Sequence, residues 1–127
     1  MTNDSSEKEK RFIPEGWHAV TPKIVVNGAN ELVDFLRKVF DATGGYTTDK
    51  PSVITIGDSR IMLSEAGIRE VTTAFLYVYV EDVDVSYQRA LDADAQSIEE
   101  PFDTPYGDRR CMVKDKWGNI WQIATHK

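Results

Sequence analysis

The chain has 127 residues, of which 41% are hydrophobic, and this is enough to bury the core of one domain. Its formal net charge of −6 at pH 7 disfavours nucleic-acid binding, which normally requires a basic stripe. The sequence has no apolar run long enough to span a membrane and no signal-peptide pattern, and its single cysteine excludes an internal disulfide. We therefore expect a cytoplasmic protein that binds neither nucleic acids nor membranes.

The first half of the chain predicts one strand, one helix and three short strands. Residues 1–12 are polar and charged, so we expect a disordered tail before a single domain over residues 13–127. Apolar residues then recur at helical spacing up to Phe40, and Gly44 and Gly45 follow as stop signals. The expected elements are a strand at 20–26, a helix at 30–40, and strands at 45–48, 52–56 and 60–64.

The second half of the chain repeats this order. Residues 73–80 are dense in β-branched and aromatic residues and form the strongest predicted strand. Asp82 is placed to cap a helix whose apolar face contains Val83, Tyr87, Ala90 and Leu91. Further strands are expected at 96–100, 109–114 and 120–125, and a polar turn at 115–119 joins the last two into a hairpin.

Short sequence echoes support an internal repeat. Residues 35–39 parallel residues 87–91, and residues 61–63 parallel residues 121–123. Two βαβββ modules, at about residues 17–66 and 72–127, would each need to bury one face of a small sheet. Joining the sheets of the two modules satisfies both, which predicts an α+β fold.

Two faces alternate along the strand at 73–80. The residues of one face are small and aliphatic and suit packing under a helix; they are Ala74, Leu76, Val78 and Val80. The other face is bulky and carries two hydroxyl groups, from Phe75, Tyr77 and Tyr79. An apolar wall with polar tips is typical of a ligand cleft. A second core layer and a dimer interface are the alternatives for this face.

Polar residues near the end of the chain are further candidates. Gln122 lies on an otherwise apolar strand, and because an unpaired buried amide is costly, it faces either the cleft or a solvated edge. Arg109 and Arg110 could place a cation at the mouth of the cleft, or form an ion pair with the adjacent Asp108. Cys111 lies within a strand, where we expect a buried, inert thiol. The common hydrolase, zinc-protease and Walker A motifs are missing.

Two phrases of the sequence resemble a known family. Residues 115–123 read Asp-Lys-Trp-Gly-Asn-Ile-Trp-Gln-Ile, with Tyr-Gly-Asp-Arg upstream at 106–109, and residues 17–22 read Trp-His-Ala-Val-Thr-Pro. The chain resembles the vicinal oxygen chelate superfamily, which includes glyoxalase I, extradiol dioxygenases and bleomycin-resistance proteins, and within it the PhnB-like branch. The resemblance implies two tandem βαβββ modules that form a curved mixed sheet around a cleft. It also implies a homodimer with the clefts at or near the subunit boundary.

The resemblance also implies where a metal would bind. Metal-dependent members hold one cation with four side chains from the first and last strands of the modules. The matching positions here are Thr21, Met62, Phe75 and Gln122, and only Gln122 could ligate, weakly. We therefore expect no metal ion and no other cofactor.

Other potential ligands do not fill this gap. The His-x-Glu pair that is frequent in the PhnB-like branch falls near Pro51 and Val53. Glu65 is the one further carboxylate near a strand end that could reach the cleft, or it is a solvated loop residue. His18 and His126 are expected to be surface or hydrogen-bonded residues.

Together these observations predict a metal-independent protein that binds a small molecule, as antibiotic-sequestering relatives do. The alternatives are a metal-dependent lyase, isomerase or dioxygenase, and a fold kept for interaction alone. We expect no catalytic residue. The residues expected to bind an antibiotic or an aromatic metabolite are Phe75, Tyr77, Tyr79, Tyr106, Arg109, Trp117 and Gln122.

Overall fold

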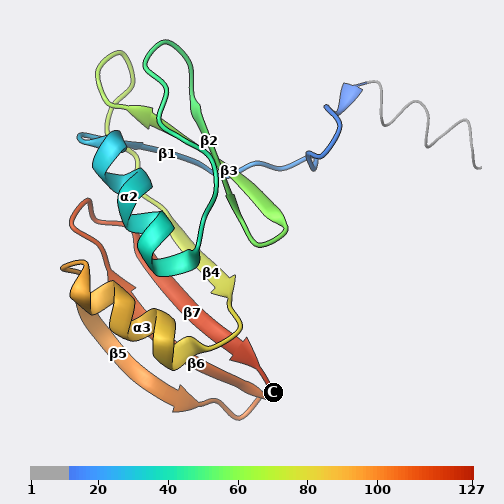
Figure 1. The fold of residues 1–127 in the computed structure, drawn as a ribbon, viewed down its shortest axis with the longest axis vertical. Helices are drawn as coiled ribbons and strands as arrows, with labels where there is room; N and C mark the ends of the chain where they lie inside the picture. The colour runs from blue at the N-terminus through green and yellow to red at the C-terminus, as the bar shows by residue number, and fades with distance from the viewer. Residues whose placement is uncertain (1–11) are drawn as a thin grey trace, which may run out of the picture.

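The computed structural model describes residues 12–127 (Figure 1), so the tail predicted at 1–12 lies outside the described residues except for Phe12. The elements of the first module are β1 (Lys23–Val26), α2 (Ala29–Phe40), β2 (Ser52–Ile56) and β3 (Ser59–Glu65). The elements of the second module are β4 (Phe75–Tyr79), α3 (Val83–Asp92), β5 (Gln96–Asp103), β6 (Asp108–Lys114) and β7 (Ile120–His126). The expected α+β class and the tandem order of the modules are confirmed.

The strands form two mixed sheets, with the orders β1-β3-β2 and β4-β7-β6-β5. In each sheet the first strand of the module pairs in parallel with the last, and the last pairs antiparallel with its hairpin partner. Met62 lies opposite Lys23 in the first sheet, and Gln122 lies opposite Tyr77 in the second. The echo between residues 61–63 and 121–123 therefore marks equivalent strands of the repeat.

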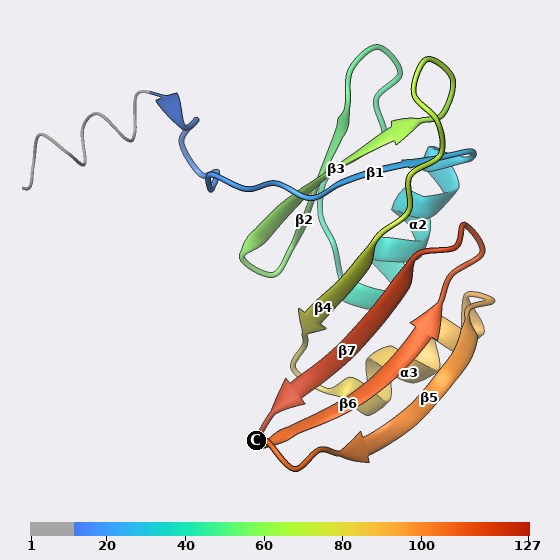
Figure 2. The ribbon, with the colours of Figure 1, turned by 180° about the vertical axis from the view of Figure 1, so that it is seen from behind.

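The helices α2 and α3 lie on the same side of the molecule and contact each other. Their apolar faces join the sheets in one hydrophobic core that spans both modules. Phe40 at the end of α2 packs against Trp121 of β7 with ring centroids 5.2 Å apart, so the modules share aromatic contacts as well. Seen from behind (Figure 2), the four-stranded sheet lies in front of α3, and no element of the described chain covers it.

One expected strand is absent, and the prediction at 45–48 is wrong. Residues 45–48 make no bridge, and the nearest pairing is a single bridge from Thr43 to Thr55. Gly44 has φ +103, and a Cβ there would lie 2.3 Å from the Val53 carbonyl oxygen, so the backbone lies tightly against β2 at this point. Thr47 then closes a turn by bonding the Lys50 carbonyl. The first sheet consequently has three strands where the second has four.

The two largest differences in strand boundaries, of three residues each, are at the start of β1 and the end of β5. β1 begins at Lys23 and not at residue 20, because Val20 is 83% exposed and Pro22 contributes only its carbonyl, to Met62 N–H. β5 continues past residue 100 to Asp103 in spite of Pro101. Register shifts on this edge strand accommodate the proline. Among the residues that the model describes, no helix is long and apolar enough to span a membrane.

Candidate functional site

The uncovered side of β4 carries three aromatic side chains. Phe75, Tyr77 and Tyr79 are 63%, 38% and 60% exposed, whereas Leu76 and Val78 point the other way and pack against the core. The alternation predicted for this strand therefore places the bulky residues on the open side of the sheet. They do not form a second core layer within the chain. The Tyr77 and Tyr79 rings lie together, with centroids 5.3 Å apart.

Asp108 joins these tyrosines to the end of the chain. Its Oδ2 accepts hydrogen bonds from the Tyr77 hydroxyl at 2.7 Å and the Tyr79 hydroxyl at 2.8 Å. Its Oδ1 lies 2.8 Å from Nδ1 of His126, and because a carboxylate can only accept, this nitrogen must carry the proton. Asp108 is 3% exposed. It is fixed at the start of β6 by Thr104, whose hydroxyl exchanges hydrogen bonds with the Asp108 backbone.

These bonds define the protonation states of the group. The Tyr77 and His126 hydrogen bonds lower the pKa of Asp108, against the opposing effect of its desolvation. Burial and the hydrogen bonds to Tyr106 and Asp108 raise the pKa of Tyr77. The bond to Asp108 also raises the pKa of Tyr79. At neutral pH the carboxylate is therefore ionised, and both hydroxyls keep their protons.

A second polar chain begins at Arg110, two residues further along β6. Its Nη1 donates to the Tyr106 hydroxyl at 2.9 Å, and its Nη2 donates to Glu99 at 3.1 Å. The guanidinium also lies 5.0 Å from the centre of the Phe102 ring. The Tyr106 hydroxyl is 3.3 Å from that of Tyr77, which links both chains.

We call this surface the aromatic face and define it by eight residues, namely Phe75, Tyr77, Tyr79, Tyr106, Asp108, Arg110, Gln122 and His126. Gln122 is half-buried between Tyr77 of β4 and Met112 of β6. Of the seven predicted ligand-binding residues, the model brings together Phe75, Tyr77, Tyr79, Tyr106 and Gln122.

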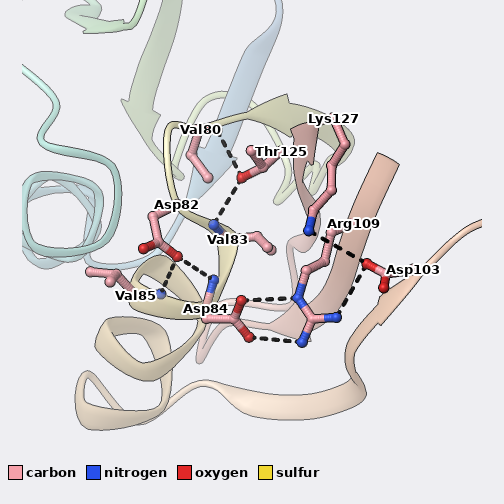
Figure 3. Close-up of polar contacts among 9 residues, drawn as sticks. All are labelled: Val80, Asp82, Val83, Asp84, Val85, Asp103, Arg109, Thr125 and Lys127. Carbon is pink, nitrogen blue, oxygen red and sulfur yellow. Dashed lines mark hydrogen bonds and ion pairs between the residues drawn. The ribbon is translucent and has the colours of Figure 1, made fainter. Parts of the chain in front are cut away.

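Arg109 lies on the opposite, helix-covered side of the sheet (Figure 3). Its guanidinium binds both carboxylate oxygens of Asp84 on α3, at 2.9 and 3.1 Å, and Asp103 of β5 at 3.3 Å. The Arg109 hydrogen bond lowers the pKa of Asp84. Our expectation that Asp108 would pair with Arg109 is wrong, because consecutive strand residues point to opposite faces. Arg109 is not brought together with the tyrosines.

Trp117 also lies away from the aromatic face. Its ring packs edge-on against Phe35 of α2, with centroids 5.9 Å apart. The turn that holds it is organised by Asp115, which is 4% exposed. Asp115 accepts hydrogen bonds from the backbone N–H groups of Trp117 and Asn119, the Asn119 amide and the Trp121 indole, at 2.9–3.0 Å. The residues that carried the family resemblance thus build a structural turn.

Glu65, a candidate for the cleft, instead caps a helix. Gly28 precedes α2 without a capping side chain of its own. The Glu65 carboxylate replaces that cap by accepting from the N–H groups of Gly28, at 3.0 and 3.2 Å, and Ala29, at 2.9 Å. These backbone bonds, the Gly28 bond most of all, lower the pKa of Glu65.

Glu65→Ala should lower the free energy of unfolding by about 1 kcal/mol, which is typical for the loss of a helix cap. The folded-state pKa of Glu65 is depressed, so its contribution is full above the unfolded-state pKa and is lost as the pH falls through the folded-state value. Urea melts of wild type and variant should therefore converge in acid. Glu70→Ala is the control and should change neither the free energy of unfolding nor its pH dependence. A stability difference between wild type and Glu65→Ala that increased on acidification would contradict the capping role of Glu65.

The positions matching the family's metal ligands are divided between two places. Thr21 and Met62 line a mostly apolar cavity of about 430 Å³ beside Trp17, whereas Phe75 and Gln122 belong to the aromatic face. They offer one hydroxyl, one thioether and one amide, a donor set that does not fit a divalent cation. Within residues 12–127, no group of three His, Cys, Asp or Glu side chains could hold a metal ion.

Sequence reasoning missed the central residue of the site. Asp108 was interpreted only as an arginine partner, Arg110 only as a possible cation at the mouth of the cleft, and His126 as a surface or hydrogen-bonded residue. The alternation of side chains along β6 could have revealed Asp108 and Arg110. Cys111 and Val113 are apolar and buried, so residues 108 and 110 must face the open side of the sheet.

Comparisons with known proteins agree with this architecture. A family model for the Glyoxalase/Bleomycin resistance protein/Dioxygenase superfamily matches residues 18–123. The uncharacterized protein Mb0911c of Mycobacterium bovis is 29% identical in an alignment covering 84% of this chain and 82% of that protein.

Solved structures share the fold. TioX from Micromonospora sp. ML1 superposes with a TM-score of 0.64 at 20% identity, covering 86% of this chain and 100% of that chain. The fosfomycin resistance protein FosX from Listeria monocytogenes, in complex with Mn(II) and sulfate, has a TM-score of 0.69 at 17% identity, covering 87% and 90%. These low identities show a common fold and no more. With a family model matched over most of its length, the chain belongs to the glyoxalase/bleomycin resistance protein/dioxygenase superfamily.

Proposed function

We propose that this protein binds a flat small molecule on the aromatic face without a metal ion, and so sequesters an antibiotic or an aromatic metabolite. The observation that carries the proposal is the exposure of three aromatic rings on β4 whose two hydroxyls are fixed by one buried carboxylate. Large exposed apolar patches on a small protein normally mark an interaction site.

The fixed geometry of these rings supports a ligand site. Because Asp108 holds the Tyr77 and Tyr79 hydroxyls, binding would not have to immobilise these two side chains, and this reduces the entropic cost of association. Phe75 adds contact area, and Gln122 adds an amide that can both donate and accept. Apolar contact area with few, well-placed polar groups is the usual composition of a small-molecule site.

A metal-dependent lyase, isomerase or dioxygenase remains the competing proposal, and the Mn(II)-containing FosX structure favours it. The donors at the matching positions argue against it, since Thr21, Met62 and Phe75 cannot replace His or Glu ligands.

Metal content separates these two proposals. The protein as purified should contain far less than one equivalent of zinc, nickel, manganese or iron per chain by elemental analysis. Chelator treatment should leave its melting temperature and any ligand affinity unchanged. Near-stoichiometric metal, with an activity lost on its removal, would refute metal independence.

We further propose a cytoplasmic homodimer of the PhnB-like type. Thr21 and Met62 of the first module line a cavity that is separate from the aromatic face of the second module. A ligand site that used residues of both modules would therefore need a second chain, so that the first module of one chain could face the second module of the other. Light scattering should give twice the chain mass of 14.4 kDa. A monomeric mass at micromolar concentration would refute the homodimer, and the aromatic face would then be an open surface of a single chain.

A thermal-shift screen tests the ligand proposal directly. Planar antibiotics and aromatic metabolites should be screened against chelator-treated protein, and at least one should raise the melting temperature in a concentration-dependent way. The same compound should fail to stabilise a Phe75→Ala, Tyr77→Ala double variant. A complete absence of stabilising compounds would favour the interaction-only alternative.

A further inference from the structure

The hydroxyl protons of Tyr77 and Tyr79 both point toward Asp108. An ionised carboxylate accepts but cannot donate, so the Tyr77 and Tyr79 protons occupy Oδ2 at 2.7 and 2.8 Å, and the Nδ1 proton of His126 occupies Oδ1 at 2.8 Å. Since the Tyr77 proton is committed to Asp108, the 3.3 Å contact with Tyr106 requires the Tyr106 hydroxyl to be the donor. The tyrosine oxygens can therefore offer a ligand only lone pairs.

The guanidinium of Arg110 is paired through both of its Nη atoms, and its buried Nε has no partner among the described residues. The Arg110 guanidinium binds Glu99 and Tyr106 and stacks on the Phe102 ring, and its side chain is 17% exposed. It is therefore paired with an acid and poorly placed to attract an anionic ligand. Within residues 12–127, the carboxylate of Asp108 has no cationic partner other than His126, whose charge depends on protonation. The chain as a whole has a net charge of −6, which favours the approach of cations.

We propose that the aromatic face selects flat ligands that carry a protonated amine, with the ammonium donating to the Tyr79 oxygen. Among the described residues this is the tyrosine oxygen of the face that accepts no hydrogen bond, because Tyr77 accepts from Tyr106 and Tyr106 accepts from Arg110. This inference rests on the proposed function and narrows it to a ligand class. Donation to Asp108 makes each tyrosine oxygen a better acceptor, because hydrogen bonds in a chain polarise one another. The tyrosine rings, with centroids 5.3 Å apart, would add a cation–π attraction for the same ammonium.

Three probes of nearly equal shape test this selectivity: tryptamine, N-acetyltryptamine and indole-3-acetate. Isothermal titration calorimetry at neutral pH should show tryptamine binding at least about tenfold more tightly than N-acetyltryptamine, with the carboxylate binding most weakly. Tyr79→Phe removes only one acceptor oxygen and should bring tryptamine close to the affinity of N-acetyltryptamine. Tyr87→Phe is the matched control because the Tyr87 hydroxyl bonds Ser97, away from this face; it should leave all three affinities unchanged.

The outcomes separate this inference from the proposed function. Equal affinities for the three probes, or a preference for the carboxylate, would overturn the selection of amines and leave small-molecule binding in place. An unchanged tryptamine preference in Tyr79→Phe would also overturn it, since the donor would then be recognised elsewhere. If no probe binds and the ligand screen is empty as well, both proposals are refuted.

Discussion

Replacing the buried Asp115 with alanine is expected to lower the free energy of unfolding by about 3–5 kcal/mol. The carboxylate accepts four hydrogen bonds, and two of the donors belong to side chains that are 0% exposed, the Asn119 amide and the Trp121 indole. Removing the acceptor leaves these buried N–H groups without partners. Asn119 would also be released from its own bond to the Ala74 N–H at the entrance to β4.

Asp58→Ala is the matched control, because Asp58 lies at the β2–β3 turn but is exposed, and among the described residues its side chain bonds only the neighbouring Ser59 hydroxyl. It should change stability by no more than about 0.5 kcal/mol in urea melts. If Asp115→Ala does not fold, Asp115→Asn should still fold with an intermediate loss, since one of its two acceptor oxygens remains. Similar small losses for Asp115→Ala and Asp58→Ala would contradict the structural role of the turn.

The second large contrast separates the aromatic face from the core. Phe40, which is 8% exposed and packs on Trp121, should lose about 3–5 kcal/mol of stability on truncation to alanine. Phe75→Ala should lose about 1 kcal/mol or less, because Phe75 is 63% exposed. A compound identified by the thermal-shift screen should nevertheless bind Phe75→Ala at least about tenfold more weakly, because the variant loses ring contact area.

A large loss of stability in Phe75→Ala would show that the ring is buried in solution. A loss in the full core range would mean that another surface covers the ring. If a second subunit provides that cover, the melting temperature of wild type should rise with protein concentration and that of the variant should not. Such a result would replace the ligand site with a dimer interface.

Much of the fold could be predicted because local patterns agree with the tertiary structure. Helical spacing up to Phe40 and the alternation along β4 placed these elements within a few residues of their observed bounds. The fourth strand of the first module could not be excluded in this way. Residues 45–48 look extended in sequence, but the backbone lies tightly against Val53 at the positive-φ Gly44, and no pairing follows the Thr43–Thr55 bridge in this segment.

The candidate site was predicted in part, for a physical reason. Alternation along one strand shows which residues share a face, and it placed Phe75, Tyr77 and Tyr79 together. It does not show their partners, because Asp108 is 31 positions from Tyr77 and meets it only through the register of β4, β7 and β6. The adjacency of Asp108 and Arg109 in sequence suggested a pair that the pleat of β6 prevents.

The most direct test is a crystal structure of the protein grown with a compound that raises its melting temperature. The compound should lie against Phe75 and Tyr77, within hydrogen-bonding distance of the Tyr79 oxygen or the Gln122 amide, with no metal ion bridging it to the protein. A ligand held by a metal ion, a ligand bound only in another cavity of the molecule, or an aromatic face filled by side chains of a second subunit would contradict the account.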